Sequence, residues 1–295
     1  MVEVFFIGTG AAVPSNERGL PAILIRERGI SLLFDCGEGT LQRLMKLGML
    51  MDINYIAISH LHADHFMGIF TIIQTMNMLG RKKPLTIISP KGINDLLTEN
   101  YKHSYFYPAF DIKVLEGSIN EDIGGLQLSS FSTCHTIESN GYLLRIKGSR
   151  NLNKEKIKLL GIEDWKLLRD LKEGKKVILN GKTIYPEEVI EEKKGVSVAY
   201  TGDTRPCDKV IKAVSKVSLL IHDSTFLDNE EAEKYGHSNA EGAAKVAKEA
   251  EVERLALFHI SSRYRKRDLA AFLTQARKIF QKTFVAEDFM YYYLR

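Results

Sequence analysis

The sequence predicts an α/β protein with one large core, because strand-like and helix-like segments follow one another along the chain. Residues 53–59 alternate apolar and polar side chains, as a half-buried strand does, and the apolar-rich residues 66–79 indicate a helix. Strand-like segments that lead into polar residues recur at residues 126–133, 196–199 and 255–258. With 295 residues, of which 44% are hydrophobic, the chain can bury one sizeable core. We therefore expect polar loops to gather at one edge of a sheet, where these strands end.

The loop between the first predicted strand and helix contains four metal-ligating side chains in six residues, with the sequence HLHADH at 60–65. In an extended segment, His60 and His62 point the same way and can reach one metal ion. Asp64 and His65, carried past by the turn into the helix, can reach a second ion. Neutral imidazole suits zinc, and a carboxylate can share the site. A polar surface loop is the alternative, but four ligand types in six positions favour a metal site.

Three more ligand-type residues, His135, Asp203 and His259, directly follow or end the strand-like segments named above. Any one of them alone would more often be a solvated loop residue or a core histidine with satisfied hydrogen bonds. Taken together with residues 60–65, they indicate a site that holds two metal ions.

Five segments resemble motifs of the metallo-β-lactamase superfamily, and within it of the tRNA 3′-processing endonucleases, the tRNase Z (RNase Z) family. The segments are FDCGEGT at 34–40, HLHADH at 60–65, His135 with SNGY at 139–142, GDT at 202–204 and HISSRY at 259–264. The second segment specifies only the superfamily. The GEGT form, the glycine-tyrosine pair after His135 and the SSRY run narrow the resemblance to the tRNA nuclease branch. It extends over nearly the whole chain.

The resemblance implies a metallo-β-lactamase αββα sandwich, two mixed sheets flanked by helices, as a single domain over residues 1–295. It implies two Zn²⁺ per subunit, although Mn²⁺ or Fe²⁺ could use the same ligands. Carried over position by position, the first ion would be bound by His60, His62 and His135, and the second by Asp64, His65 and His259, with Asp203 bridging. Asp35 would orient a ligand histidine by accepting its hydrogen bond, and could also cap the turn before Gly37.

The implied activity is removal of the 3′ trailer from precursor tRNA, leaving a 3′-hydroxyl, by attack of a metal-bridged hydroxide on the phosphodiester. Asp64 belongs to the implied catalytic set, together with His237 as general acid and Asp223 as the carboxylate that holds it. The family usually has threonine at Asn239 and often glutamate at Asp223. The alternative for His237 is that it merely precedes the start of a helix, which Ser238 and Asn239 could begin before residues 240–250.

Residues 147–195 are predicted to form an inserted arm between the third and fourth motifs. They contain 13 Lys and Arg against 9 Asp and Glu, an excess as large as the net charge of +4 of the whole chain. We expect two short helices over 153–171, broken at Gly161, and a hairpin over 175–184 that turns at an Asn-Gly pair. In the tRNase Z family an insertion here grips the tRNA elbow. The candidate phosphate contacts are Lys154, Lys156, Lys158, Lys175 and Lys176.

An ordinary charged surface is the alternative for this segment, because acidic residues are mixed into it. The glycine-proline motif common in family arms is also missing, since residues 163–166 read EDWK. A second basic cluster follows His259, and within it Arg263 and Ser261 are the candidates for holding phosphate near the metals. Residues 14–19 resemble a family loop near the tRNA 3′ end but differ from it at two positions. The loop therefore leaves open whether CCA-bearing precursors are cut or spared.

The remaining features fit a cytoplasmic enzyme. No stretch approaches the ~20 apolar residues of a membrane span, and the N-terminus lacks a signal pattern. The three cysteines lack zinc-ribbon spacing, and their odd count argues against a disulfide framework, so Cys36 and Cys134 are expected to be small buried side chains. The aromatic residues 101–110 favour a core or subunit contact over nucleic-acid stacking. The family resemblance implies a homodimer with precursor tRNA as partner. A small-molecule hydrolase of the same superfamily, a thioesterase or phosphodiesterase, is the alternative function.

Overall fold

The computed structural model describes residues 1–294, which form two compact units. The larger unit combines Met1–Arg145 with Ser197–Leu294, and the smaller unit is Ile146–Val196. The insertion predicted at residues 147–195 falls within the smaller unit. Within residues 1–294, none of the helices has both the length and the hydrophobicity that crossing a membrane requires.

Two mixed sheets, each with seven strands among the described residues, form the frame of the larger unit. In the first sheet, neighbours along β20-β1-β3-β4 are antiparallel and neighbours along β4-β5-β6-β7 are parallel. Its strands are β1 (Val2–Gly8), β3 (Ala22–Glu27), β4 (Ile30–Phe34), β5 (Tyr55–Ala57), β6 (Leu85–Ser89), β7 (Ile112–Glu116) and β20 (Met290–Leu294).

The second sheet has the order β19-β17-β16-β15-β10-β9-β8. Its strands β15, β16, β17 and β19 are parallel neighbours, whereas β8 and β9 are antiparallel. The strands are β8 (Asn120–Asp122), β9 (Leu126–Ser132), β10 (Asn140–Ile146), β15 (Val196–Tyr200), β16 (Leu219–Asp223), β17 (Leu255–Phe258) and β19 (Thr283–Val285). A separate short pair joins β2 (Gly10–Ala11) to β18 (Ile260–Ser261) in parallel.

The two sheets face each other across a layer of aromatic side chains. Phe34 of β4 stacks on Tyr142 of β10 and on Tyr200 of β15, with ring centroids 5.7 and 5.5 Å apart. Phe6 of β1 lies 6.3 Å from Phe258 of β17, again between ring centroids. All five side chains are fully buried. Aromatic rings bury a large apolar area each, so this layer stabilises the packing of one sheet on the other.

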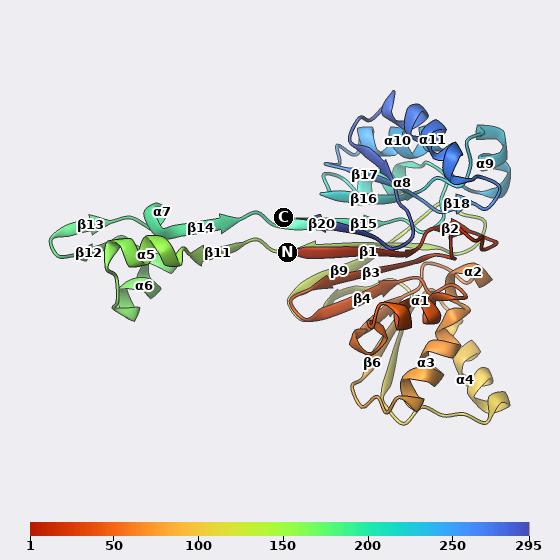
Figure 1. The fold of residues 1–295 in the computed structure, drawn as a ribbon, viewed down its shortest axis with the longest axis horizontal. Helices are drawn as coiled ribbons and strands as arrows, with labels where there is room; N and C mark the ends of the chain where they lie inside the picture. Colours follow the sequence, from red (N-terminus) through yellow and green to blue (C-terminus); the bar gives the residue numbers. More distant parts are fainter. Residues whose placement is uncertain (295) are drawn as a thin grey trace. The chain divides into compact units, whose positions relative to one another are not determined.

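Helices cover the outer faces of the sheets, which gives the order helix, sheet, sheet, helix (Figure 1). The helices on the side of the first sheet are α1 (Thr40–Lys46), the 3₁₀ helix η1 (Leu50–Asp52), α2 (Ala63–Phe66), α3 (Gly68–Met78) and α4 (Ile93–Ser104). The second sheet is covered by α8 (Asp208–Ala213), α9 (Asn229–Tyr235), α10 (Ala240–Glu249), η2 (Lys266–Asp268) and α11 (Leu269–Arg277). The predicted αββα sandwich is confirmed.

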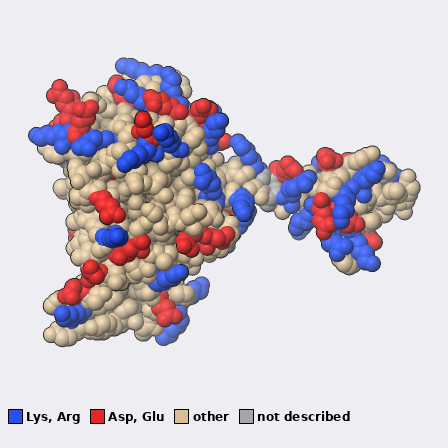
Figure 2. All heavy atoms as spheres, turned by 180° about the vertical axis from the view of Figure 1, so that it is seen from behind, with Lys and Arg blue, Asp and Glu red and all other residues tan. Residues whose placement is uncertain are grey.

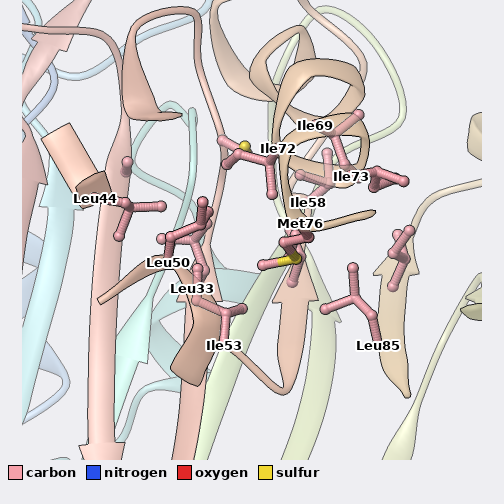
Figure 3. Packing of buried hydrophobic residues seen from close by; sticks show 14 of the residues in the cluster. Leu33, Leu44, Leu50, Ile53, Ile58, Ile69, Ile72, Ile73, Met76 and Leu85 are labelled. Atoms are coloured by element: carbon pink, nitrogen blue, oxygen red, sulfur yellow. The ribbon is translucent and has the colours of Figure 1, made fainter. Parts of the chain in front are cut away.

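Helix α3 shows how the sequence pattern fixes the frame behind the histidine-rich loop. Its fully buried side chains recur at helical spacing and are Ile69, Ile72, Ile73 and Met76. They pack in one cluster with Leu33, Ile58 and Leu85 of the first sheet region (Figure 3). The strand predicted over residues 53–59 is shorter, Tyr55–Ala57, and the helix predicted over 66–79 is present as α3, preceded by the single turn α2. The loop at 60–65 is therefore anchored on both sides by buried elements.

The smaller unit has its own small core, formed by Ile162, Leu171, Val177, Ile184 and Val189. Its elements are β11 (Ser149–Leu152), α5 (Lys154–Leu160), α6 (Trp165–Lys172), β12 (Val177–Leu179), β13 (Lys182–Ile184), α7 (Pro186–Val189) and β14 (Ile190–Lys193). Strand β11 pairs with β14, and β12 with β13, both antiparallel.

The two helices and the hairpin predicted for this unit are confirmed. Helix α5 begins after Asn153, whose side chain accepts hydrogen bonds from two backbone N–H groups of the first turn, and ends at Gly161. Gly161 has φ 64°, the left-handed conformation that glycine adopts at low cost. The hairpin turns at Asn180 and Gly181, whose φ values are 49° and 77°. Two adjacent residues with positive φ match the twist of a tight hairpin.

Candidate metal centre and active site

The histidine-rich loop leads from β5 into α2, in the conformation that the sequence predicts. His62 has an extended backbone, with φ −73° and ψ 141°, directly before the helix. Asp64 and His65 lie in the single turn of α2. The side chains of His60 and His65 are fully buried. The turn thus separates two ligand-type residues in the extended segment from two in the helix.

The first group of ligand-type residues consists of His60, His62, His135 and Asp203, whose nearest ligand atoms all lie within 4.8 Å of one another. The Nδ1 atom of His62 is 3.0 Å from Nε2 of His60 and 3.2 Å from Nε2 of His135. Oδ2 of Asp203 is 3.6 Å from Nε2 of His60. The structure therefore joins the loop after β5 to residues that follow β9 and β15.

The second group is Asp64, His65 and His259. The Nε2 atoms of His65 and His259 are 3.2 Å apart, and Oδ2 of Asp64 is 3.5 Å from each of them. Oδ2 of Asp203 is 3.3 Å from Nε2 of His65. Since the same oxygen faces His60, Asp203 lies between the two groups. All seven predicted ligand positions are thus brought to one place at the ends of the strands.

The polar atoms of these groups fit a divalent cation better than they fit one another. A neutral imidazole has only one N–H, so three converging ring nitrogens cannot all be paired by hydrogen bonds. Among the described residues, Oδ1 of Asp203 is a buried oxygen without a hydrogen-bond partner. Burial lowers the pKa of His60, His62 and His135, which favours the neutral form that binds metals. Imidazole nitrogens with carboxylate oxygens are a donor set suited to divalent transition metals.

A layer of hydrogen bonds behind the cluster fixes the orientation of the rings. Nδ1 of His65 lies 2.7 Å from Oδ2 of Asp35, an oxygen that also accepts from the hydroxyl of Tyr200. Asp35 also accepts from the backbone N–H of Ser59 at 2.6 Å. Three other histidines use Nδ1 in the same way: His60 with Ser59 Oγ (2.9 Å), His135 with the carbonyl of Gly236 (2.9 Å) and His259 with Thr225 Oγ1 (2.9 Å). These contacts leave Nε2 of each ring facing the cluster.

Two residues of the site adopt the left-handed backbone conformation that is uncommon outside glycine. Asp35 has φ 53° directly after β4, and His259 has φ 63° directly after β17. Such a conformation costs on the order of 1–3 kcal/mol and persists where the surrounding structure enforces it. Here it turns the side chain of His259 into the cluster, and that of Asp35 towards Nδ1 of His65 behind the cluster. Strain of this kind is typical of functional sites.

His237 and Asp223 form a hydrogen-bonded pair beside the cluster. Nδ1 of His237 lies 2.8 Å from Oδ2 of the buried Asp223, and 3.8 Å from Oδ2 of Asp203. The other oxygen of Asp223 accepts from the backbone N–H (3.0 Å) and the hydroxyl (2.7 Å) of Thr225. Burial lowers the pKa of His237, but the carboxylates of Asp223 and, to a smaller extent, Asp203 outweigh burial and raise this pKa to about 9. The imidazole is therefore protonated at neutral pH, with its Nδ1–H held by Asp223.

The helix-start interpretation of the segment around His237 is confirmed, whereas the general-acid role of His237 stays a prediction. Asn239 is the N-cap of α10, because its side chain accepts from the backbone N–H of Gly242 at 2.7 Å. The same segment also presents His237 to Asp223. The shorter aspartate at 223 reaches the histidine directly from the end of β16.

A cavity of about 530 Å³ opens beside the cluster. The proposed site residues that line it are His62, Asp64, Asp203, His237, His259, Ser261 and Arg263. Its wall also includes two aromatic residues, Phe226 and Tyr235, which sequence reasoning did not select. Phe226 follows Asp223 by three residues and Tyr235 precedes His237 by two. Their closeness in sequence to these two candidates was the signal that could have indicated a place in the site. Arg263 forms an ion pair with both carboxylate oxygens of Glu231, at 2.6 and 2.8 Å.

The five candidate lysines all lie in the smaller unit, where both signs of charge are mixed (Figure 2). Lys154, Lys156 and Lys158 are exposed on α5, and Lys176 is exposed after α6. Lys175 is paired with Glu173 at 2.7 Å and with Asp170 at 3.6 Å. A phosphate would have to displace these two carboxylates from Lys175.

The loop at residues 14–19 is held from inside the protein. Arg18 is only 5% exposed and donates hydrogen bonds to the hydroxyl of Thr9 and, at 2.8 Å, to the carbonyl of Ala286. Asp288 accepts from the backbone N–H groups of Thr9 (2.9 Å) and Gly19 (2.7 Å). Arg18 thus stabilises the loop instead of facing solvent. Asp288 is a supporting residue that the sequence did not reveal, since it lies 279 positions from Thr9.

The sequence argued against a disulfide framework and for Cys134 as a small buried side chain, but Cys134 is only half-buried and is bonded to Cys207, with Cα atoms 6.6 Å apart. An odd count leaves one cysteine over but does not prevent the other two from pairing. These two are 73 residues apart, so only the fold brings them together. The backbone N–H of Arg205 also donates to the carbonyl of Cys134 at 2.9 Å. Among the described residues, Cys36 is the one free cysteine and is buried, as predicted.

Replacing both Cys134 and Cys207 by serine is expected to lower the melting temperature by roughly 5–10 °C. A disulfide that closes a loop of this length typically stabilises by about 2–4 kcal/mol, and 1 kcal/mol corresponds to about 2–4 °C in proteins of 150–250 residues. Calorimetry of the oxidised wild type and the double variant measures the difference. Under reducing conditions the two proteins should melt together. Three free thiols in the denatured, unreduced wild type would show that the bond is absent.

Two facing mixed sheets, with histidines and aspartates gathered at the strand ends, define the metallo-β-lactamase class of hydrolases. A family model described as a β-lactamase superfamily domain matches residues 188–260, and one described as anti-Pycsar protein Apyc1 matches residues 2–158. Human tRNase Z, short form, superposes with a TM-score of 0.72 and 26% identity over 99% of both chains. A Bacillus subtilis metallo-β-lactamase fold protein, YhfI, superposes with a TM-score of 0.71 at 18% identity, over 99% of this chain and 98% of that one, which supports the fold alone.

Curated relatives match from end to end. The ribonuclease Z of Sulfurisphaera tokodaii is 50% identical over 100% of this chain and 99% of its own length. The ribonuclease Z of Metallosphaera sedula is 48% identical over 100% of both. The chain belongs to the ribonuclease Z family, and with it to the hydrolytic endonucleases. The resemblance found in the sequence is confirmed.

Proposed function

We propose that this chain is a zinc-dependent endoribonuclease that removes the 3′ trailer from precursor tRNA and leaves a 3′-hydroxyl. The observation that carries the proposal is that His237, held by Asp223, lines the same cavity as residues of the histidine and aspartate cluster. Full-length relatives named ribonuclease Z support the substrate class. The arrangement combines a cation site with a proton donor, which hydrolysis of a phosphodiester with a poor leaving group requires.

Two Zn²⁺ ions would occupy the two groups, and Mn²⁺ or Fe²⁺ could use the same donors. The first ion would be held by His60, His62 and His135, the second by Asp64, His65 and His259, and Asp203 would be shared. The distances of 3.6 and 3.3 Å from Oδ2 of Asp203 to His60 and His65 support the shared role. When bound, such a pair of ions lowers the pKa of a water molecule and offsets charge on the phosphoryl oxygens.

Asp35 and Asp64 would set the geometry of the second ion's ligands. Asp35 accepts from Nδ1 of His65, so Nε2 of that ring keeps its lone pair directed at the cluster. Asp64 accepts a hydrogen bond from the backbone N–H of Ala12 at 2.8 Å, which fixes its carboxylate beside His259. The loop that contains Ala12 thereby becomes part of the wall of the site.

His237 would be the general acid. Its Nδ1–H is held by Asp223, so the proton available for transfer is the one on Nε2. The oxygen that leaves the phosphorus is the 3′-oxygen of the tRNA, a poor leaving group until it is protonated. Proton donation by His237 to that oxygen yields the 3′-hydroxyl end.

The remaining candidates would bind the substrate. Arg263 and Ser261 line the cavity and would hold phosphate oxygens near the scissile bond. The exposed lysines of the unit Ile146–Val196 would contribute affinity for tRNA that does not depend on sequence and weakens with salt. We also propose a homodimer in the cytoplasm, as the family resemblance implies.

A competition experiment separates this function from small-ester hydrolysis. The purified protein is given a precursor tRNA with a 3′ trailer and, in parallel, bis(p-nitrophenyl) phosphate and a thioester. We expect trailer removal at nanomolar to micromolar tRNA, and inhibition of ester turnover by added precursor. The proposal would be contradicted if the esters were hydrolysed rapidly while the precursor tRNA was not cleaved and did not inhibit their hydrolysis.

A further inference from the structure

We propose that Tyr235 forms a stacking site for one nucleobase of the substrate, the base of the nucleotide whose 3′-oxygen is released. This inference rests on the proposed function, because it places an RNA strand in the cavity. It concerns a residue that neither the metal cluster nor the His237–Asp223 pair uses.

The aromatic wall of the cavity is built around Phe226, which is only 5% exposed. Its ring is stacked with that of Tyr235, with centroids 5.9 Å apart and an interplanar angle of 30°. The guanidinium of Arg263 lies 5.0 Å from the Phe226 centroid, and the ring of His237 meets it edge-on at 5.9 Å. Phe226 is therefore a fixed support between the proposed acid, the proposed phosphate ligand and Tyr235.

Tyr235 itself is 48% exposed, although it stands against this buried support. It is the last residue of α9, and Gly236 follows it with φ 80° before the chain reaches His237. A large aromatic ring exposed in a cavity is a ready partner for another flat ring. The ammonium of Lys234 lies 5.3 Å from the Tyr235 centroid, on a solvent-exposed side chain that can move aside.

The chemistry of the neighbouring residues indicates which ring would stack here. His237 delivers its proton to the 3′-oxygen, so the ribose bearing that oxygen must lie next to its imidazole. Phe226 contacts the same imidazole, and Tyr235 contacts Phe226. Only the ring of Phe226 therefore lies between this imidazole and Tyr235, which places the base attached to that ribose close to Tyr235. Unpaired bases of single-stranded RNA are commonly held by stacking on aromatic side chains.

The test is a double-mutant cycle in which the tyrosine ring is removed from the protein and the base is removed from the RNA, separately and together. Wild type and Tyr235→Ala are compared on a precursor with its natural nucleotide before the cut, and on one with an abasic nucleotide there. We expect Tyr235→Ala to lower kcat/KM on the natural precursor by roughly 5- to 100-fold, the size of typical base-stacking losses. The abasic precursor should cost the wild type a similar factor, and the variant no further loss.

Two matched variants sharpen the result. Tyr235→Phe keeps the ring and should restore kcat/KM to near the wild-type value. Tyr293→Ala makes the same deletion at a tyrosine that is 50% exposed and outside the cavity lining, and should leave cleavage unchanged. A loss in Tyr235→Ala that persists in full on the abasic precursor would overturn the stacking site, as would no loss on the natural one. Failure of the wild type to cut any precursor would instead overturn the proposed function.

Discussion

The His65→Ala variant is expected to lose bound divalent metal and, with it, cleavage of precursor tRNA. His65 is fully buried, and its Nε2 lies within 3.5 Å of atoms of Asp64, Asp203 and His259. Deleting this ring removes a donor at the point where the two groups of ligands meet. Loss of an outer-shell partner alone costs about 10–100-fold in metal affinity or activity. Removing a ligand itself should exceed the upper end of that range.

Metal per chain, measured by mass spectrometry after dialysis, and the rate of precursor cleavage are the two readouts. His103→Ala is the matched control, because it makes the same deletion at a histidine that is exposed on α4. The control should keep the full metal content and rate. A His65→Ala protein that holds two ions per chain and cuts at the wild-type rate would contradict the assignment of the cluster.

The His237→Ala variant should keep its metal but lose about 10²–10⁴-fold in kcat on precursor tRNA, the usual contribution of a general acid. The pair with Asp223 raises the pKa of His237 to about 9, so the wild-type imidazole carries its proton at neutral pH. In the proposed mechanism, alanine would leave the departing 3′-oxygen without a proton donor. Bis(p-nitrophenyl) phosphate offers a comparison, since nitrophenolate leaves without being protonated.

Single-turnover rates on both substrates measure the effect. The loss on bis(p-nitrophenyl) phosphate is expected to be much smaller than the loss on tRNA. Equal losses on the two substrates would show that His237 supports the site in some other way than by proton transfer. Unchanged tRNA cleavage would remove it from the mechanism altogether.

The positions of the site residues could be predicted because they follow strand ends. Residues 60–65 form a local pattern, and the extended backbone at His62 with a helical turn at Asp64 is what that pattern indicates. His135, Asp203 and His259 each follow an apolar strand, and the strands before Asp203 and His259, β15 and β17, belong to a parallel set whose ends lie at one edge of the sheet. A periodic pattern of apolar residues is enough to find those strands.

Contacts between distant loops could not be predicted from the sequence. The Cys134–Cys207 bond joins two loops that periodicity cannot pair, and the odd count pointed the wrong way. The hydroxyl of Tyr200 bonds Asp35 across the two sheets, 165 positions away. Neither contact has a local signal, because each depends on which strands become neighbours.

In the smaller unit, too, local structure could be predicted from the sequence, whereas the contacts of its charged side chains could not. Its helices and hairpin follow from local caps and turn residues such as Asn153 and Gly161. The state of each lysine depends on its neighbours in space, and Lys175 is engaged by Glu173 and Asp170. Counting charges therefore located the basic segment but did not show which lysines are already paired with carboxylates and which could bind phosphate directly.

Mapping the product ends tests most directly whether the cluster and His237 hydrolyse precursor tRNA. The protein is stripped with a chelator, reloaded with Zn²⁺ and incubated with a precursor that carries a 3′ trailer. Cleavage should require the metal and occur next to the discriminator nucleotide, leaving a 3′-hydroxyl on the tRNA and a 5′-phosphate on the trailer. Cleavage by the stripped protein, or a 2′,3′-cyclic phosphate at the new end, would contradict metal-dependent hydrolysis with protonation of the 3′-oxygen.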